Sequence, residues 1–179
     1  VPPYINKYYI LDLQPGNSFV RYAVAQGHTV FMVSWRNVGA EQGHLTWDDY
    51  LEEGVFKALA TAKEITKSDR VNALGFCVGG TLLGAGLAVL AAKKKDLVAS
   101  ATFLATMLDF SDAGQISLFV DEASVKTREA TIGGGGLLSG GDLAFVFSSL
   151  RANDLVWPYV VNNYLLGGSP AAFDMLYWN

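Results

Sequence analysis

The chain has 179 residues, a length that suits one domain, or one domain and part of another. Hydrophobic residues make up 51% and charged residues 17%, which excludes intrinsic disorder and allows a sizeable core. The formal net charge of −4 gives no basic surface for nucleic acid. The single cysteine excludes an internal disulfide framework and suits a reducing compartment. The chain opens at VPPYINKYY without a methionine, so we expect it to be a fragment of a longer protein.

The first part of the chain alternates between helical and strand patterns. Residues 19–27 (FVRYAVAQG) predict an amphipathic helix that ends at glycine, with Asn17 or Ser18 as its N-cap. Residues 28–35 (HTVFMVSW) are almost continuously apolar, a pattern typical of a strand buried on both faces. A long helix is then expected from about residue 46 to residue 67, with acidic residues in its first turn.

Two more strands are expected in the next forty residues. RVNALGF (70–76) and LVASATFLA (97–105) both read as strands, and an apolar segment separates them. The order strand, helix, strand, helix, strand predicts an α/β fold, a mostly parallel sheet with helices on both faces.

The pattern changes near residue 110. Residues 131–143 are rich in glycine but lack the Gly-Lys-Ser/Thr end of a phosphate loop, which favours a flexible loop. Residues 145–168 read as helical, with Pro158 in the first turn of a helix. We therefore predict an α/β core over residues 1–110 and a helical cap over residues 111–179.

The segment LGFCVGGTLLGAGLAVLAAKKK has two interpretations. Residues 73–92 are long and apolar enough to span a membrane as one helix. Five glycines between residues 75 and 86 weaken a lone helix, however, and the alternation calls for a strand, a turn and a helix here. We therefore expect no membrane span.

The second interpretation is a nucleophile elbow, Gly75-x-Cys77-x-Gly79. In such an elbow a strand and a helix meet at a tight turn, so side chains two residues before and after the nucleophile would clash. The turn lifts Cys77 to the C-terminal edge of the sheet, where open α/β sheets bind ligands. The following helix points its positive end at the thiolate, and the backbone N–H of Val78 is a natural oxyanion donor. A lone buried cysteine without this frame is usually an inert packing residue.

Several motifs resemble a known family. GFCVGGT, together with VPPYINKYYILDLQP, GHTVFMVSWRN and NDLVWPYVVNNYL, is similar to the catalytic domain of class I polyhydroxyalkanoate synthases. The resemblance extends over the whole chain and implies an α/β-hydrolase core with an inserted cap. It also implies that the nucleophilic cysteine is Cys77.

The resemblance implies an activity and partners as well. The family polymerises (R)-3-hydroxyacyl-CoA, such as 3-hydroxybutyryl-CoA, into a growing polyester chain and releases CoA, without a cofactor or a metal. It implies a homodimer formed through the cap, a cytoplasmic location at the surface of polyester granules, and contacts with granule-associated proteins. The alternatives are a cysteine-variant esterase or thioesterase, or a non-catalytic hydrolase-fold binding protein.

The expected base is not found in this chain. In α/β hydrolases the order is nucleophile, acid, histidine, yet His28 and His44 both precede Cys77. His28 begins a predicted strand at the far sheet end, His44 lies in a loop at the correct end, and Asp109 is favoured as a helix-cap or structural residue. The resemblance implies a histidine and an aspartate beyond Asn179.

The second oxyanion donor is expected in VPPYIN. The prolines cannot donate, which leaves the backbone N–H groups of Tyr4, Ile5 and Asn6, and we prefer Ile5. Aromatic residues of the cap could line an acyl tunnel or a dimer face, or form the core of the cap: Trp157, Tyr159, Tyr164, Phe173, Tyr177 and Trp178.

Overall fold

The structure is a computed structural model that describes residues 1–5 and 8–170. Asn6, Phe173, Tyr177 and Trp178, which the sequence analysis considered as site residues, lie outside the described residues. The described chain forms two compact units: unit 1 contains residues 1–5, 8–37 and 45–109, and unit 2 contains residues 38–44 and 110–170.

Unit 1 begins with short elements. A 3-10 turn, η1 (Tyr8–Leu11), precedes strands β1 (Asp12–Gln14) and β2 (Asn17–Ser18), which pair antiparallel. Helix α1 (Phe19–Ala25) follows at once, and its N-cap is Ser18, whose side chain accepts a 2.8 Å hydrogen bond from the N–H of Arg21. The predicted helix and its serine cap are therefore confirmed.

The predicted strand over residues 28–35 is wrong. These residues form no strand, and Val30 and Phe31 are exposed rather than buried on both faces. Both edges of strand β3 (Val71–Phe76) are already bonded, so residues 28–35 do not pair with it, and they pair with no other described strand. One edge pairs with β4 (Val98–Leu104), and the other bonds to Val1, whose carbonyl accepts from the N–H of Phe76 at 3.0 Å. An apolar run predicts burial in a sheet only where a partner strand exists.

The predicted long helix is confirmed, with one irregularity. It consists of α2 (Trp47–Asp49), a π-helical turn η3 (Tyr50–Phe56) and α3 (Lys57–Thr66). Its start is fixed by a capping box, in which the N–H of Thr46 donates to the Asp49 carboxylate at 2.7 Å. It ends at Lys67, which adopts a left-handed conformation with φ +57°.

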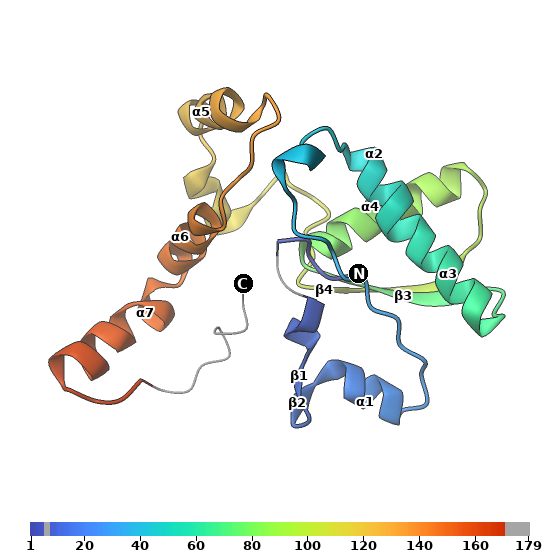
Figure 1. Ribbon diagram of the computed structural model, residues 1–179, viewed down its shortest axis with the longest axis horizontal. Helices are drawn as coiled ribbons and strands as arrows, with labels where there is room; N and C mark the ends of the chain where they lie inside the picture. Colours follow the sequence, from blue (N-terminus) through green and yellow to red (C-terminus); the bar gives the residue numbers. More distant parts are fainter. Residues whose placement is uncertain (6–7, 171–179) are drawn as a thin grey trace. The chain divides into compact units, whose positions relative to one another are not determined.

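The centre of unit 1 is a strand–helix–strand unit made of β3, α4 (Val78–Ala92) and β4. The two strands are parallel, and Gly75 pairs with Phe103. Figure 1 shows the long helix and α4 on the same side of this strand pair. Apolar side chains of the two helices and one face of β3 form the core: Leu51, Val55, Leu59, Ala73, Leu82, Leu83 and Leu90.

The apolar stretch that resembled a membrane span is divided between these elements. Its first residues belong to β3, and its helix, α4, has 15 residues. None of the helices in the described residues is both long and apolar enough to cross a bilayer. The strand–turn–helix interpretation of this segment is confirmed.

Unit 2 is helical in its described part. Its longer helices are α5 (Glu122–Ile132) and α6 (Gly140–Leu150), and the glycine-rich segment left between them is residues 133–139, shorter than expected. The shorter elements are η2 (Ala40–Gln42), η4 (Gly114–Phe119), α7 (Ala152–Leu155) and η5 (Tyr159–Leu165). Pro158 lies at the N-terminal end of η5, in agreement with its predicted place at the start of a helix. No described residue of unit 2 is buried.

Candidate active site

Cys77 lies at the turn between β3 and α4, in a backbone conformation rare for a residue with a side chain. Its φ is +53° and its ψ is −130°. Such a conformation costs about 1–3 kcal/mol and persists only where the surroundings impose it. Here the N–H of Cys77 donates to the Leu104 carbonyl at 2.8 Å, and its own carbonyl accepts from the N–H of Gly80 at 2.9 Å. The strain is therefore held by the neighbouring strand and by the first turn of the helix.

The glycines on either side of Cys77 allow this close packing. A Cβ on Gly75 would overlap the Cα of Gly80, and a Cβ on Gly79 would lie 2.5 Å from the Val1 carbonyl oxygen and closer still to that of Pro2. Both gaps are too short for a real Cβ, and the opposing atoms are backbone, which cannot turn away. The crowding around these two glycines is the kind that a nucleophile elbow requires.

Gly80 is a third crowded glycine, and the sequence analysis did not assign it to the elbow. A Cβ there would overlap the side chain of Thr106. The Thr106 hydroxyl in turn donates to the Leu104 carbonyl at 3.1 Å, in the loop after β4. The second glycine of the GG pair was visible in the sequence, but its neighbour is 26 residues away and only the fold brings it there.

The loop after β4 is bonded to the elbow at a second point. The hydroxyl of Thr81, in the first turn of α4, donates to the Met107 carbonyl at 2.7 Å. Ala105 begins this loop with a positive φ of +45°. Because the carboxyl ends of parallel strands meet at one sheet edge, Cys77 and this loop form one connected corner of unit 1.

The start of the chain runs along the edge of β3 that does not pair with β4. The Val1 nitrogen donates to the Leu74 carbonyl at 2.7 Å, and the Phe76 N–H donates to the Val1 carbonyl at 3.0 Å, a parallel pairing. The chain therefore leaves Val1 in the direction of the C-terminal end of β3, where Cys77 lies. This places Tyr4 and Ile5 in the turn that follows, next to the elbow.

Backbone donors are available at the elbow. Within the described residues the structure gives the N–H of Val78 no hydrogen-bond acceptor, as expected for the first residue of a helix. The positive end of α4 lies at the same place. Ile5 is the last described residue before residues 6–7. The roles of the Val78 and Ile5 N–H groups as donors to an oxyanion stay predictions.

Three aromatic side chains, which the sequence analysis did not single out, form a cluster beside the elbow. The Tyr4 ring lies 5.3 Å from the Tyr50 ring and 6.3 Å from the Trp35 ring, centroid to centroid, and Trp35 lies 5.7 Å from Tyr50. Burial raises the pKa of the Tyr4 hydroxyl above its ordinary value of 10.0, and the charges of Tyr50 and Cys77 raise it further. Tyr4 therefore stays neutral at physiological pH.

The other candidate side chains are placed as follows. Asp109 lies in the loop after β4, and His28 is exposed and follows α1. His44 belongs to unit 2. The base is expected elsewhere in the complete protein, and that stays a prediction. In unit 2, Trp157 and Tyr164 are 56% and 84% exposed, so these two rings do not form a core within the unit.

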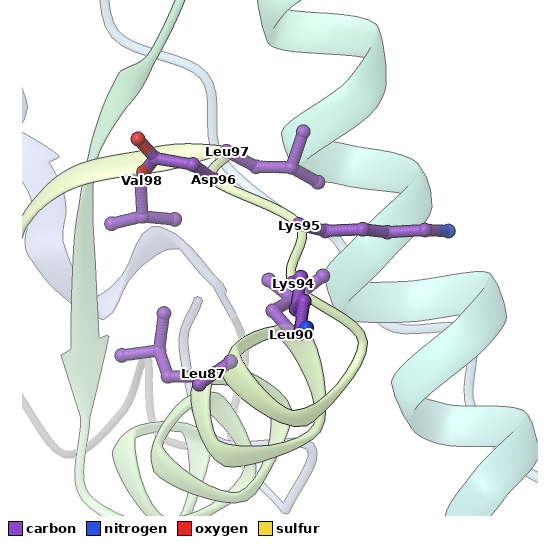
Figure 2. Close-up of a pocket in the computed structure, with 8 residues that line it drawn as sticks. Leu87, Leu90, Lys94, Lys95, Asp96, Leu97 and Val98 are labelled. Carbon is purple, nitrogen blue, oxygen red and sulfur yellow. The ribbon is translucent and has the colours of Figure 1, made fainter.

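A surface hollow lies at the other end of α4. It is lined by the last turns of α4 and the start of β4, and Figure 2 shows Leu87 and Val98 at its wall, with Lys95 extending away from it. The start of β4 lies at the N-terminal ends of the two parallel strands, whereas Cys77 follows the C-terminal end of β3. This hollow is therefore separate from the elbow.

Comparison with known proteins agrees with this geometry. The family model of the alpha/beta hydrolase fold matches residues 10–179. The chain belongs to the α/β-hydrolase fold family, which the sequence predicted.

Individual relatives show which members of this fold family the chain is similar to. The chain is 56% identical to the "Poly(3-hydroxyalkanoate) polymerase subunit PhaC" of Cupriavidus necator and 46% identical to that of Rhizobium meliloti. It is also 46% identical to the "Poly(3-hydroxyalkanoate) polymerase" of Methylorubrum extorquens. The three alignments cover 100%, 99% and 100% of the chain, but only 31%, 29% and 30% of the relatives. The resemblance to polyhydroxyalkanoate synthases is confirmed, and the chain spans about a third of the length of these relatives.

Proposed function

We propose that this chain carries the nucleophile of an enzyme that polymerises (R)-3-hydroxyacyl-CoA into polyhydroxyalkanoate. The observation that carries the proposal is the elbow: Cys77 sits at φ +53° between a parallel strand and the start of a helix. The relatives named as poly(3-hydroxyalkanoate) polymerases support a polyester product.

The first step is transfer of the acyl group from CoA to the enzyme. The Cys77 thiolate attacks the thioester carbonyl carbon, and the negative charge moves to the carbonyl oxygen. The N–H of Val78, with that of Ile5, stabilises this oxyanion. The carbon–sulfur bond to CoA then breaks, CoA leaves as a thiol after taking up the proton that the Cys77 thiol gave to the base, and an S-acyl cysteine remains.

The second step extends the polymer. The hydroxyl of a chain end or of a second substrate attacks the S-acyl carbonyl carbon, an ester bond forms, and the Cys77 thiolate is released. The hydroxyl proton passes to a base, which we expect to be a histidine oriented by an aspartate beyond Asn179. Cysteine suits this chemistry because a cysteine thioester keeps the activation of the CoA thioester, whereas a serine ester would lose it before chain growth.

The setting of the enzyme is part of the same proposal. A homodimer that forms through residues of the cap, a cytoplasmic location at the granule surface and contacts with granule-associated proteins remain expectations of the resemblance. Exposed apolar side chains in unit 2, among them Leu118 and Tyr164, are compatible with a surface that another body covers.

The proposal is tested in the complete protein with 3-hydroxybutyryl-CoA. Mass spectrometry should find the acyl group on the peptide that contains Cys77, and polymer should form. Cys77→Ala should abolish both without loss of the fold, because the small side chain fits the elbow. Cys77→Ser should be acylated far more slowly, since its hydroxyl is much less ionised.

The same experiment separates the alternatives. Release of 3-hydroxybutyrate without polymer would indicate a thioesterase. Binding without an acyl adduct or CoA release would indicate a binding protein. Substantial polymer from Cys77→Ala would remove the covalent assignment.

A further inference from the structure

The Pro2 carbonyl has a specific partner that joins two distant parts of unit 1. The indole N–H of Trp35 donates to this carbonyl at 2.8 Å across 33 residues of sequence. Pro2 and Pro3 are among the fully buried side chains. An indole N–H can only donate, and a buried carbonyl without a donor costs free energy. This hydrogen bond therefore favours one placement of residues 1–3.

The Trp35 ring is itself held in place. A Cβ on Gly54 would overlap the six-membered ring of Trp35, so a glycine in the long helix makes room for it. Tyr4 packs edge-on to Trp35, and Tyr50 packs at a tilt. The ring therefore contacts the long helix, the Pro2 carbonyl and the first residue after the prolines at once.

The Pro2 carbonyl also faces the elbow, since it is the atom that a Cβ on Gly79 would meet. One backbone group thus lies between the Trp35 indole and the turn that presents Cys77. Tyr4 and Ile5 follow after Pro3, so a movement of Pro2 would shift their N–H groups relative to Cys77. A displacement of about 1 Å at such a site can cost about 100-fold in rate.

We propose that Trp35 is a positioning residue for the reaction: its indole N–H fixes the Pro2 carbonyl and thereby holds the Tyr4–Ile5 turn in register with Cys77 as the second oxyanion donor. The inference rests on the proposed function, because it concerns the oxyanion formed when Cys77 attacks a thioester. Trp35 acts through the backbone and touches no reacting atom in this account.

The test compares two reactions of the same thiolate in the complete protein. Acylation by 3-hydroxybutyryl-CoA is an attack on a carbonyl carbon and passes through an oxyanion. Alkylation by iodoacetamide is a displacement of iodide at a saturated carbon and forms no oxyanion. Both rates are read by mass spectrometry on the peptide that contains Cys77. Trp35→Phe keeps an aromatic ring and removes the N–H. We expect acylation to slow about tenfold, the effect of one hydrogen bond, while alkylation stays within about twofold.

Two further variants control the result. A tryptophan analogue at position 35, in which sulfur replaces the indole N–H, keeps the ring volume and should reproduce the loss even if Trp35→Phe fails to fold. Trp47→Phe, at an exposed tryptophan in the same unit, should leave both rates unchanged.

The outcomes distinguish the two proposals. Unchanged acylation in the Trp35 variants, or an equal fall in acylation and alkylation, would overturn the positioning role, because a merely structural role moves both rates together. If the parent protein gains no acyl group at Cys77, the proposed function fails and this inference fails with it. An acylated parent with unaffected Trp35 variants removes only the role of Trp35.

Discussion

The two units of the chain differ in how they bury apolar side chains. Unit 1 encloses Val55, Leu82 and Leu83 completely, between two helices and a strand. Unit 2 has no buried residue in its described part, and Leu118, Phe145 and Tyr164 are 78%, 69% and 84% exposed. Each fully buried leucine or valine contributes about 1.5–3 kcal/mol of hydrophobic free energy. Unit 1 therefore has an internal source of stability that the described part of unit 2 lacks.

This difference matters for where chemistry can be placed. A strained residue such as Cys77 needs rigid surroundings, and the elbow is built directly on the buried core through α4 and β3. The described part of unit 2 offers no such core. This contrast between the units can be tested in the complete protein.

The largest effect is expected from a core truncation. Leu83→Ala should lower the free energy of unfolding by about 2–5 kcal/mol, because the removed side chain is fully buried among the core residues. Its match in unit 2 is Leu118→Ala in η4, at a side chain 78% exposed, which should change stability by about 0.5 kcal/mol or less. Chemical denaturation measures both. A comparable loss from Leu118→Ala would mean that unit 2 is covered in the complete protein.

A smaller effect is expected from adding one methyl group at a glycine. Gly79→Ala should destabilise by about 1–3 kcal/mol and reduce acylation of Cys77, because its Cβ meets the backbone of Val1 and Pro2. Gly134→Ala, in the glycine-rich segment of unit 2, meets open space and should be close to neutral. Thermal unfolding and adduct formation at Cys77 provide the two measurements. An active, fully stable Gly79→Ala protein would contradict the packing of the elbow.

The smallest effect concerns two helix caps. Asp121 caps α5 in unit 2, where hydrogen bonds from the backbone N–H and the hydroxyl of Ser124 hold the pKa of its carboxyl below the ordinary value of 3.8. A lowered pKa in the folded state means that this cap stabilises α5 above the ordinary pKa and is lost as pH falls through the folded value. Ser18, the cap of α1 in unit 1, accepts the Arg21 N–H with a hydroxyl that does not itself titrate, although that hydroxyl also donates to the Asp12 carboxylate.

Acid should therefore loosen the first turn of α5 before that of α1. Amide hydrogen exchange, followed from neutral pH to about pH 3 and corrected for intrinsic rates, measures the protection of both turns. Asp121→Asn, a cap of similar strength without a charge, is the control and should remove the pH dependence at α5. Equal loss of protection at the two helix starts would show that the caps do not set this response.

Local patterns in the sequence determined most of unit 1. The helix that Ser18 caps, the long helix behind the capping box at Thr46, and the strand–turn–helix around Cys77 were all predicted. Each depends on interactions within a few residues: a side chain bonded to the N–H three residues on, an apolar period, or glycines two positions from a strained turn. The elbow glycines were found because the constraint on them lies in the turn itself.

Tertiary structure decided what depends on distant partners. Residues 28–35 have the composition of a buried strand but form none: β4 and Val1 occupy the two edges of β3, and these residues pair with no other described strand. In the same way, nothing next to Gly80 in the sequence indicates that Thr106 packs against it, and nothing near Trp35 indicates that its indole meets the Pro2 carbonyl. The amino-acid sequence shows which side chains prefer burial and which donors need an acceptor. Which group satisfies that need is fixed only when the whole chain packs, because backbone hydrogen bonds and van der Waals contacts act over a few ångströms of space regardless of separation in sequence.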